Sequence, residues 1–403
     1  MLRLAKDCAR LSLMKLKPLS IYIHIPFCEK RCDYCDFVSF DDCSSQMDAY
    51  VDALCGEIKG YSEKCKKHVI ETLFFGGGTP STLSAEQMTK IFESLRENFV
   101  FCKDVEASIE CNPNSLTKEK LDCYIQLGIN RISLGIQSIN DITLSTLGRV
   151  HTKEQVEQAL ELLDTSGIDN VSIDFMYNIP MPRDIADAGM ARNIYGELDY
   201  IFSKFPFIKH VSAYALTVYE GTEIAKKLDF EMLYDLNEDV AIAEEFELSD
   251  VLKKYGFTRY EVSNWTRPGF ECRHNKVYWT VKREYLGLGV SASGLFNNER
   301  YENTHDLNMY LLNPEKISTS VKRSNLDIIN EAIILGLRTK YGIDTGHLKK
   351  LGVNLQIQKS FEILELANMG LLRVTKNSIK ATKDGMLLLN LVTARLMMDD
   401  IGS

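Results

Sequence analysis

The chain has 403 residues, of which 45% are hydrophobic and 26% charged, and its formal net charge is −9. This length predicts two or three domains with enough apolar residues for a buried core. The negative charge argues against a broad surface that binds nucleic acid. The chain also lacks an apolar run of about eighteen residues, the length that a stable membrane insertion would need.

The first residues differ in composition from the rest of the chain. Residues 1–17 are rich in Lys and Arg, and Asp7 is their only acidic residue. Their apolar residues are too scattered for the hydrophobic region of a secretory signal. We expect a flexible leader over 1–18, with a short basic presequence for an organelle as the alternative.

From residue 19 to about 220, apolar runs alternate with helical patterns. The apolar runs predict strands at 19–25, 69–75, 104–110, 130–136, 169–175 and 208–215. The helical patterns predict helices at 45–64, 84–98, 117–127, 139–146, 152–166 and 185–203. Repeated strand–helix units favour a parallel sheet with right-handed crossovers. Because six units are too few to close an eight-stranded barrel, we expect an α/β fold with a partial (β/α)6 TIM-like barrel.

The second half of the chain predicts a different organisation. Residues 221–255 have a helical pattern with charged faces, and short strands are predicted at 257–263 and 276–281. The segment 284–295 is rich in Gly and Ser and predicts a tight loop. We group residues 226–320 as a C-terminal α+β extension of the barrel core, which spans 19–225.

The last part of the chain, residues 321–403, predicts a winged-helix-like domain. Helices are predicted at 326–337, 345–351 and 355–369, and a small hairpin follows between Gly370 and Ala381. This domain lacks the basic stripe of a helix that recognises DNA. We therefore expect it to dock or cap the barrel rather than to bind nucleic acid.

Three cysteines with C-x3-C-x2-C spacing follow the first predicted strand: Cys28, Cys32 and Cys35. Three thiolates can bind three irons of a 4Fe–4S cluster and leave the fourth iron open to a small molecule. Structural zinc usually has four ligands, and His24 could supply the fourth, but it alternates within the predicted strand and no second Cys pair follows. We favour the cluster, which requires a reducing compartment and predicts a cytoplasmic protein.

A run of glycines ends the second predicted strand. Gly76, Gly77 and Gly78 precede Thr79 and a proline, and no Lys-Ser/Thr pair follows, so the run is not a P-loop. Glycine allows the backbone to approach a ligand closely, although such a run alone usually marks a tight turn. Behind an open-iron cysteine motif, it indicates a backbone edge that binds an amino or carboxylate group.

These motifs, with four further segments, resemble the radical S-adenosylmethionine (SAM) superfamily. Within it, the chain is similar to the HemW-type heme chaperones, which are related to oxygen-independent coproporphyrinogen III dehydrogenase. The matching segments are Tyr22–Cys28, Phe75–Ser81, Glu110–Pro113, Asn130–Ser138, Leu147–Arg149 and His274–Trp279. The resemblance extends from residue 20 to about 295, and the tail is similar to that family's C-terminal domain. It implies a radical SAM core with the cluster and SAM as cofactors.

The resemblance also implies which residues bind SAM. Gly77, Gly78 and Thr79 match the backbone that binds the methionine part of SAM. The other implied SAM contacts are Tyr22, Tyr34, Glu110, Gln137, Arg149 and Asp174.

Most of these residues follow the ends of successive predicted strands, where barrels of this kind carry their functional groups. The planar guanidinium of Arg149 suits a carboxylate. From the residues alone, each also has an ordinary interpretation. Tyr34 would simply shield the cluster, and Glu110 would be a solvated acid at a strand end.

A second motif lies in the predicted extension and comprises His274, Asn275, Tyr278 and Trp279. An imidazole is a good axial ligand for heme iron, and aromatic side chains can pack against a porphyrin. A lone histidine is nevertheless more often a core or surface residue. The resemblance implies heme binding, because HNxxYW is a heme-binding motif in HemW-type proteins.

Two departures separate this chain from the dehydrogenase relatives. Phe37 occupies the position of an extra cysteine in those proteins, and only about twenty residues precede the first strand, where the relatives have a longer segment. We therefore expect a chaperone that delivers heme to apo-hemoproteins, such as respiratory ones, and we assign no catalytic residue. A homodimer is left open. The alternatives are the dehydrogenase itself, or a radical SAM enzyme in which His274 is structural.

Overall fold

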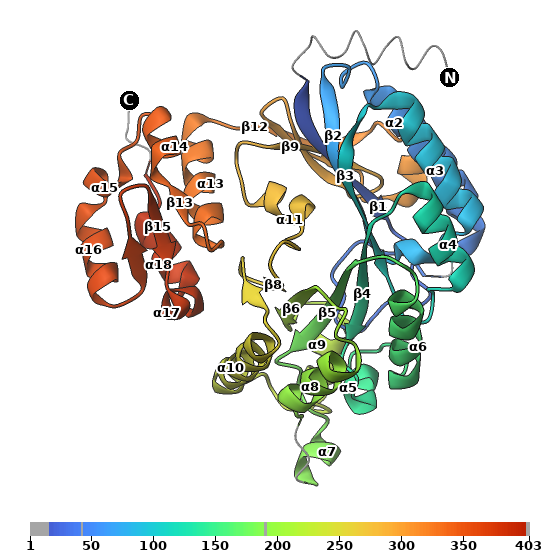
Figure 1. Ribbon diagram of the computed structural model, residues 1–403, viewed down its shortest axis with the longest axis horizontal. Helices are drawn as coiled ribbons and strands as arrows, with labels where there is room; N and C mark the ends of the chain where they lie inside the picture. Colours follow the sequence, from blue (N-terminus) through green and yellow to red (C-terminus); the bar gives the residue numbers. More distant parts are fainter. Residues whose placement is uncertain (1–15, 42, 189–191, 400–403) are drawn as a thin grey trace.

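The computed structural model describes residues 16–41, 43–188 and 192–399. A twelve-stranded sheet has the order β12-β11-β10-β9-β1-β2-β3-β4-β5-β6-β8-β7. Its six central strands are parallel and curve into a partial barrel, as predicted (Figure 1). They are β1 (Lys17–Ile25), β2 (His68–Gly77), β3 (Phe101–Cys111), β4 (Arg131–Gln137), β5 (Asn170–Tyr177) and β6 (His210–Ala215). Residues 1–15 of the expected leader lie outside the described residues, and Lys17 and Pro18 already belong to β1.

Helices follow these strands, and the longer ones cover their outer face (Figure 1). They are η1 (Ser44–Gln46), α2 (Met47–Tyr61), η2 (Pro80–Thr82), α3 (Ala85–Asn98), α4 (Lys118–Leu127), α5 (Asp141–Thr146), α6 (Lys153–Asp164), α7 (Arg183–Asp187) and α8 (Ile194–Lys204). Ser84 and Gln87 form a capping box at the start of α3, which explains why the sequence marks this helix so clearly. The single helix predicted at 185–203 is wrong in its first part, because α7 and α8 are separate helices.

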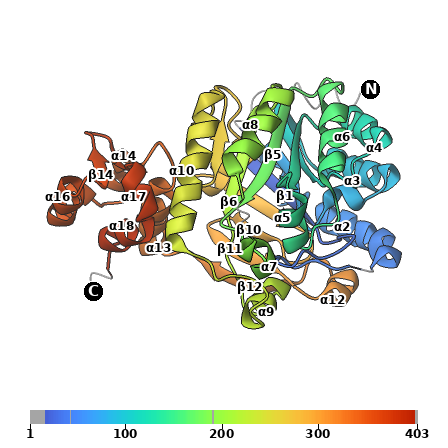
Figure 2. The same cartoon turned by 90° about the horizontal axis from the view of Figure 1, so that it is seen from below.

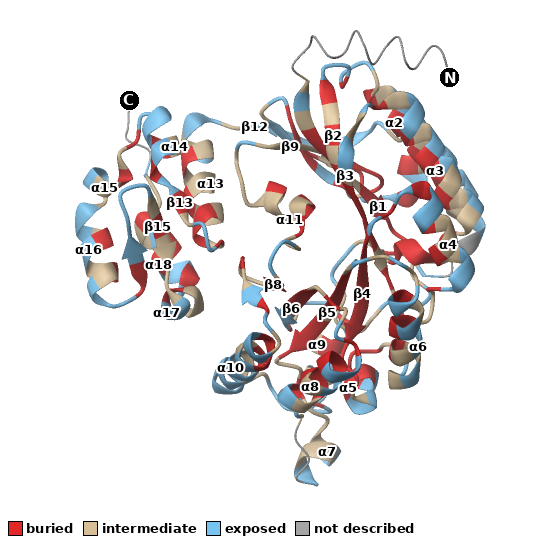
Figure 3. Cartoon of the chain, viewed as in Figure 1, coloured by how far each residue is buried: buried red, intermediate tan, exposed pale blue. Residues whose placement is uncertain are grey.

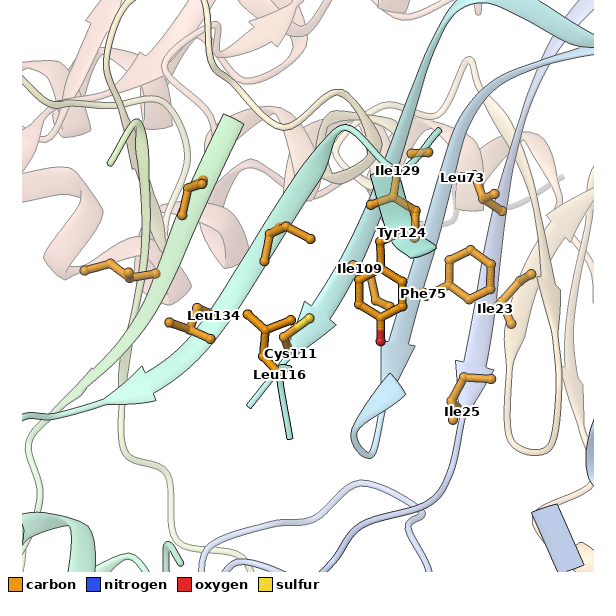
Figure 4. Packing of buried hydrophobic residues seen from close by; sticks show 14 of the residues in the cluster. Ile23, Ile25, Leu73, Phe75, Ile109, Cys111, Leu116, Tyr124, Ile129 and Leu134 are labelled. Atoms are coloured by element: carbon orange, nitrogen blue, oxygen red, sulfur yellow. The ribbon is translucent and has the colours of Figure 1, made fainter. Parts of the chain in front are cut away.

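The two faces of the barrel strands differ in chemistry. On β2, Phe75 packs outward and stacks on Phe92 of α3 with ring centroids 5.2 Å apart. Figure 4 shows Phe75 among the apolar side chains of neighbouring strands, next to Tyr124 of α4. The alternate residues Thr72 and Phe74 lie on the inner face, since side chains alternate along a strand. Figure 3 shows the central strands buried along most of their length.

The extension adds strands to both edges of the barrel sheet. Its elements are α9 (Glu223–Asp229), α10 (Glu238–Lys254), β7 (Thr258–Arg259), β8 (Asn264–Thr266), α11 (Arg273–Tyr278), β9 (Glu284–Leu288), β10 (Ser293–Phe296), β11 (Glu299–Asn303), α12 (Leu307–Leu312) and β12 (Ile317–Lys322). Two predictions here are wrong. The strand expected at 276–281 begins inside helix α11, and the loop expected at 284–295 contains β9 and β10. The strand β9 forms because it pairs in parallel with the edge of β1.

The C-terminal part has a hydrophobic cluster of its own, which includes Ile333, Leu366 and Val392. Its elements are α13 (Asn325–Leu337), β13 (Ile343–Asp344), α14 (Thr345–Lys350), α15 (Leu355–Gln358), α16 (Ser360–Asn368), β14 (Leu372–Val374), β15 (Ser378–Ala381), α17 (Lys383–Leu387) and α18 (Leu389–Leu396). The predicted hairpin is the antiparallel pair β14–β15. We call this part, Asn325–Leu396, the C-terminal unit. It lies to one side of the barrel in both views (Figures 1 and 2).

None of the helices in the described ranges is long and apolar enough to span a membrane.

Candidate functional site

The three motif cysteines lie in the loop between β1 and η1, and all are free and partly buried. The N–H of Cys35 donates a hydrogen bond to the carbonyl oxygen of Cys32 at 3.1 Å, which folds the second half of the motif into a turn. Among the described residues, no group of three or more His, Cys, Asp or Glu is arranged to hold a single metal ion. A 4Fe–4S cluster instead distributes its thiolates over separate irons. Cys28, Cys32 and Cys35 are the residues of this loop that would hold such a cluster.

Asp33 fastens this loop to two other parts of the barrel mouth. Its N–H donates to the carbonyl oxygen of Leu147 at 3.0 Å, and its own carbonyl accepts from the N–H of Ile224 at 2.9 Å. Its carboxylate pairs with Lys227 of α9 at 2.5 Å. The cysteine loop is thus held between the end of α5 and α9, at the carboxyl ends of the strands.

The glycine run lies directly against the cysteine loop. The N–H of Gly78 donates to the carbonyl oxygen of Ile25 at 2.8 Å, and the Thr79 hydroxyl donates to Sγ of Cys28 at 3.6 Å. A Cβ added to Gly78 would lie 2.8 Å from the Phe27 carbonyl oxygen and 3.0 Å from that sulfur. Only glycine fits such a close approach of two backbones.

Arg149 links the cysteine loop to the ends of two strands. Its Nη1 donates to Sγ of Cys32 at 3.3 Å, while Nη2 donates to Oδ1 of Asn112 at 2.8 Å and to the Gly135 carbonyl oxygen at 2.7 Å. Asn112 also donates from Nδ2 to the Thr79 hydroxyl at 3.1 Å. Asn112 was not predicted as a site residue, although it belongs to the matching segment Glu110–Pro113.

Gln137 ends β4 next to this group. Its φ is +60°, an uncommon value for a residue other than glycine and one that often occurs at functional sites. A Cβ on Gly135 would lie 3.0 Å from Nε2 of Gln137, 3.2 Å from Oδ1 of Asn112 and 3.6 Å from Nη2 of Arg149. Polar atoms of these three side chains therefore converge above Gly135.

The carboxyl groups of Glu110 and Asp174 are buried on the inner side of the barrel, close enough for the charge of Asp174 to affect Glu110. Burial and, to a smaller extent, the nearby Asp174 carboxylate raise the pKa of Glu110 to about 8. Burial also raises the pKa of Asp174, against the effect of hydrogen bonds from Ser212 and Ser133. A pair of buried carboxyls is a receptor for amino and hydroxyl groups, the groups that SAM would present.

The two predicted tyrosine contacts occupy different places. The Tyr22 hydroxyl lies 3.0 Å from Nδ1 of His24 on the inner face of β1. Tyr34 packs against an apolar cluster that includes Leu147 and Leu216. Burial raises the pKa of Tyr34, so its hydroxyl stays neutral. Tyr34 thus shields one side of the cysteine loop.

The HNxxYW motif forms helix α11, which packs against the inner face of β2. The side chain of His274 is fully buried, and its two ring nitrogens each lie 2.8 Å from a hydroxyl oxygen, Nδ1 from Thr72 and Nε2 from Tyr278. Burial lowers the pKa of His274 to about 3, so the ring is neutral. Both nitrogens are therefore engaged within the protein in this conformation.

Phe74 places this helix next to the other site residues. Its ring stacks on His274 at 5.1 Å and on Tyr22 at 6.3 Å, measured between ring centroids. The N–H of Asn275 donates to Sγ of Cys272 at 3.5 Å, which caps α11. Trp279, at the end of α11, lines a cavity between this helix and the C-terminal unit.

Comparisons with known proteins agree with this geometry. Residues 22–187 match the model of the Radical SAM superfamily, and residues 324–388 match that of the HemN C-terminal domain. The chain is 33% identical over 398 residues to the heme chaperone HemW of Lactococcus lactis, covering 96% of this chain and 100% of that protein. It is 31% identical to HemW of Bacillus subtilis, with 92% and 97% covered.

One solved structure covers almost the whole chain. Coproporphyrinogen III oxidase (HemN) from Escherichia coli, a radical SAM enzyme, superposes with a TM-score of 0.82 at 22% identity, covering 98% of this chain and 93% of that one. At this identity the likeness establishes the fold.

The partial barrel and the cysteine loop at its mouth define a radical SAM protein, a class that uses a 4Fe–4S cluster and SAM. End-to-end similarity at this level is more specific than the shared fold. The chain belongs to the HemW family.

Proposed function

We propose that this protein is a heme chaperone that holds a 4Fe–4S cluster and SAM in its barrel and binds heme beside α11. The observation that carries the proposal is the position of the HNxxYW helix. It lies between the candidate SAM site, which it reaches through Phe74, and a cavity lined by Trp279. The full-length similarity to proteins named heme chaperone HemW supports the same function.

In this proposal, Cys28, Cys32 and Cys35 hold the cluster, which supplies an open iron and an electron when it is bound. The backbone of Gly77 and Gly78 and the guanidinium of Arg149 bind the methionine part of SAM. The remaining polar groups of the SAM site are Tyr22, Thr79, Glu110, Gln137 and Asp174. Tyr34 excludes water from the cysteine loop.

The acceptors of the heme would be apo-hemoproteins, in a reducing compartment such as the cytoplasm. We further propose that the C-terminal unit, within residues 321–403, docks against the extension, 226–320, and that the core, 19–225, holds the cofactors. The N–H of Lys340 donates to the Tyr260 carbonyl oxygen at 2.9 Å across this junction, which supports such docking. A homodimer is part of the proposal and is tested by the molar mass in solution.

The competing function is coproporphyrinogen III dehydrogenase. Phe37, which stands where those relatives have an extra cysteine, is 68% exposed at the barrel mouth and offers no thiol. This observation favours the chaperone.

One experiment separates the two functions. The full chain is reconstituted anaerobically with iron and sulfide, titrated with heme, and assayed with coproporphyrinogen III under reducing conditions with SAM. We expect a saturable Soret shift and no protoporphyrinogen. Product formation would establish the dehydrogenase, and the absence of heme binding would refute the chaperone.

A further inference from the structure

The backbone makes an uncommon turn at Gln137, between the end of β4 and the segment that follows. The N–H of Ser138 donates to the carbonyl oxygen of Ile136 at 2.7 Å, and φ of Gln137 is +60°. A hydrogen bond that spans a single residue of positive φ closes a γ-turn of the rare, strained kind. Such a turn persists only where neighbouring groups hold the backbone on both of its sides.

Two side chains hold the backbone before Gln137. Nη2 of Arg149 donates to the Gly135 carbonyl oxygen at 2.7 Å. Nε2 of His151 lies 3.0 Å from the Ile136 carbonyl oxygen. Because a carbonyl oxygen only accepts hydrogen bonds, Nε2 of this buried ring must carry the hydrogen. The loop that carries Arg149 therefore fixes the β4 side of the turn.

Glu197, in the first turn of α8, holds the backbone after Gln137. Its Oε2 accepts a hydrogen bond from the Ser138 hydroxyl and, at 3.0 Å, a second one from the N–H of Ile139. The Glu197 side chain is only 8% exposed. Removal of this carboxylate would leave two buried donors, directly after the turn, without their partner.

Arg192 supplies the charge that a buried carboxylate needs. Its Nε donates to Oε1 of Glu197 at 2.8 Å, and the arginine side chain is only 4% exposed. Its Nη1 donates to the Met176 carbonyl oxygen, near the end of β5, at 2.7 Å. The two buried charges compensate each other, since either one alone would be costly. The pair thereby ties the segment after β4 to the end of β5, the strand that carries Asp174.

We propose that Glu197 and Arg192 are a positioning pair for the SAM site, which holds the γ-turn so that Gln137 faces the ligand. The inference rests on the proposed function, since it takes Gln137 as a SAM contact. The pair acts through the backbone of Gln137. A chain in which this turn relaxes presents Gln137 correctly for only part of the time. Its apparent dissociation constant for SAM then rises in inverse proportion to that fraction.

The test uses the full chain, reconstituted anaerobically with its cluster, and SAM as the probe. The change that SAM causes in the electron paramagnetic resonance spectrum of the reduced cluster gives the dissociation constant. Glu197→Ala should raise this constant by about tenfold, while the iron and sulfide content stays at the wild-type value. Ser138→Ala, which removes one of the two hydrogen bonds to Glu197, should raise it by about threefold. This second variant tests the inference if Glu197→Ala does not fold.

Glu331→Ala is the matched control, because Glu331 and Arg323 form another largely buried pair, also at 2.8 Å, on α13 and next to β12. It should lower the thermal stability and leave the affinity for SAM unchanged. A loss of SAM affinity in Glu331→Ala as large as that in Glu197→Ala would reduce the effect to a general loss of stability and overturn the inference.

A double-mutant cycle shows whether Glu197 acts through Gln137. If it does, Glu197→Ala should cost less than about a further twofold in SAM affinity once Gln137 is replaced by alanine. An equal loss in both backgrounds, or wild-type affinity in the folded Glu197→Ala and Ser138→Ala variants, would refute the positioning role. If the wild-type chain itself shows no spectral change with SAM, the proposed SAM site fails instead, and the two failures are thereby distinguished.

Discussion

The backbone N–H of Gly77 donates a hydrogen bond to Oε2 of Glu110, 3.3 Å away at the end of the neighbouring strand. Burial, reinforced by Asp174, raises the pKa of this carboxyl to about 8. At neutral pH most of the Glu110 carboxyl groups are therefore protonated. A cationic ligand such as the amino group of SAM favours the ionised form, so its binding is coupled to release of this proton.

The affinity for SAM should consequently depend on pH. Below pH 8 the ionised form of Glu110 is the minor one, and its population rises up to about tenfold per pH unit. We expect the dissociation constant for SAM to fall from pH 6 to pH 8 and then to level off. Calorimetric titrations in buffers of different ionisation enthalpy measure the proton release directly. Glu110→Gln should bind SAM weakly and without this slope, whereas an equal slope in the variant would assign the proton to another group.

The stability of the apoprotein should respond to Glu110 with the opposite sign. A carboxyl whose folded pKa is raised contributes stability that is fully present below its unfolded pKa and is lost as the pH rises through the folded value. The window here lies between about pH 4.5 and 8. Glu110→Gln should therefore be more stable than the wild type at pH 9, by about 1–2 kcal/mol, and lose this advantage near pH 5. Urea unfolding at both pH values measures the difference.

The cysteine loop gives a prediction about cluster content. Replacement of Cys28, Cys32 or Cys35 by serine should abolish the 4Fe–4S cluster, because each thiolate binds a separate iron. Iron and sulfide analysis after anaerobic reconstitution checks this result. Cys102→Ser, a change at a partly exposed cysteine at the start of β3, serves as the control. A full cluster in all three motif variants, or zinc in its place, would contradict the assignment.

Gly78 should be as important for the cluster as the cysteines. In Gly78→Ala the new methyl group would lie within 3.0 Å of the Phe27 carbonyl oxygen and of the Cys28 sulfur, so the cysteine loop must move. We expect the iron content to fall to less than about half of the wild-type value, because strain at such a contact costs about 1–3 kcal/mol. Gly56→Ala on α2, whose nearest neighbour is 3.9 Å away, should keep full iron content.

Glu106 should control the position of α11. Its carboxylate accepts hydrogen bonds from the backbone N–H groups of Arg273, at 3.0 Å, and His274, at 2.9 Å, and it is almost fully buried. Glu106→Ala leaves these donors unsatisfied, so we expect a loss of about 2 kcal/mol in the free energy of unfolding. Heme affinity should fall while the SAM-induced change in the cluster spectrum persists. Unchanged heme affinity in a folded variant would show that α11 does not shape the heme site.

The parallel barrel could be predicted because its strands are continuous apolar runs, such as Ile21 to Ile25, bounded by helical patterns. β9 could not, since it depends on pairing with β1 more than two hundred residues earlier in the chain, as in the pair Ile21 and Leu286. The strand predicted at 276–281 overlaps the short helix α11 for the same reason. Its first turn is fixed by Glu106 on β3, which no local pattern reveals.

In the candidate site, too, local patterns predict some residues, whereas others depend on contacts between distant parts of the chain. Residue types and spacing were sufficient to select the three cysteines and the glycine run. Spacing gives no information about the partners of a ring nitrogen, so the sequence could not show that both nitrogens of His274 lie within hydrogen-bond distance of hydroxyl groups. Asn112 could not be preferred over its neighbours from the sequence. Its role arises from hydrogen bonds with Arg149 and Thr79, which lie in loops that follow other strands.

The ring of Phe74 stacks between Tyr22 and His274 and so joins the proposed SAM site to the HNxxYW helix through a single side chain. Linkage between two binding sites is reciprocal as a matter of thermodynamics. Whatever factor SAM applies to the heme dissociation constant, heme must apply to the SAM dissociation constant. Titrating either ligand in the presence of the other therefore measures one and the same coupling free energy, and replacing Phe74 with leucine shows how much of it passes through this ring.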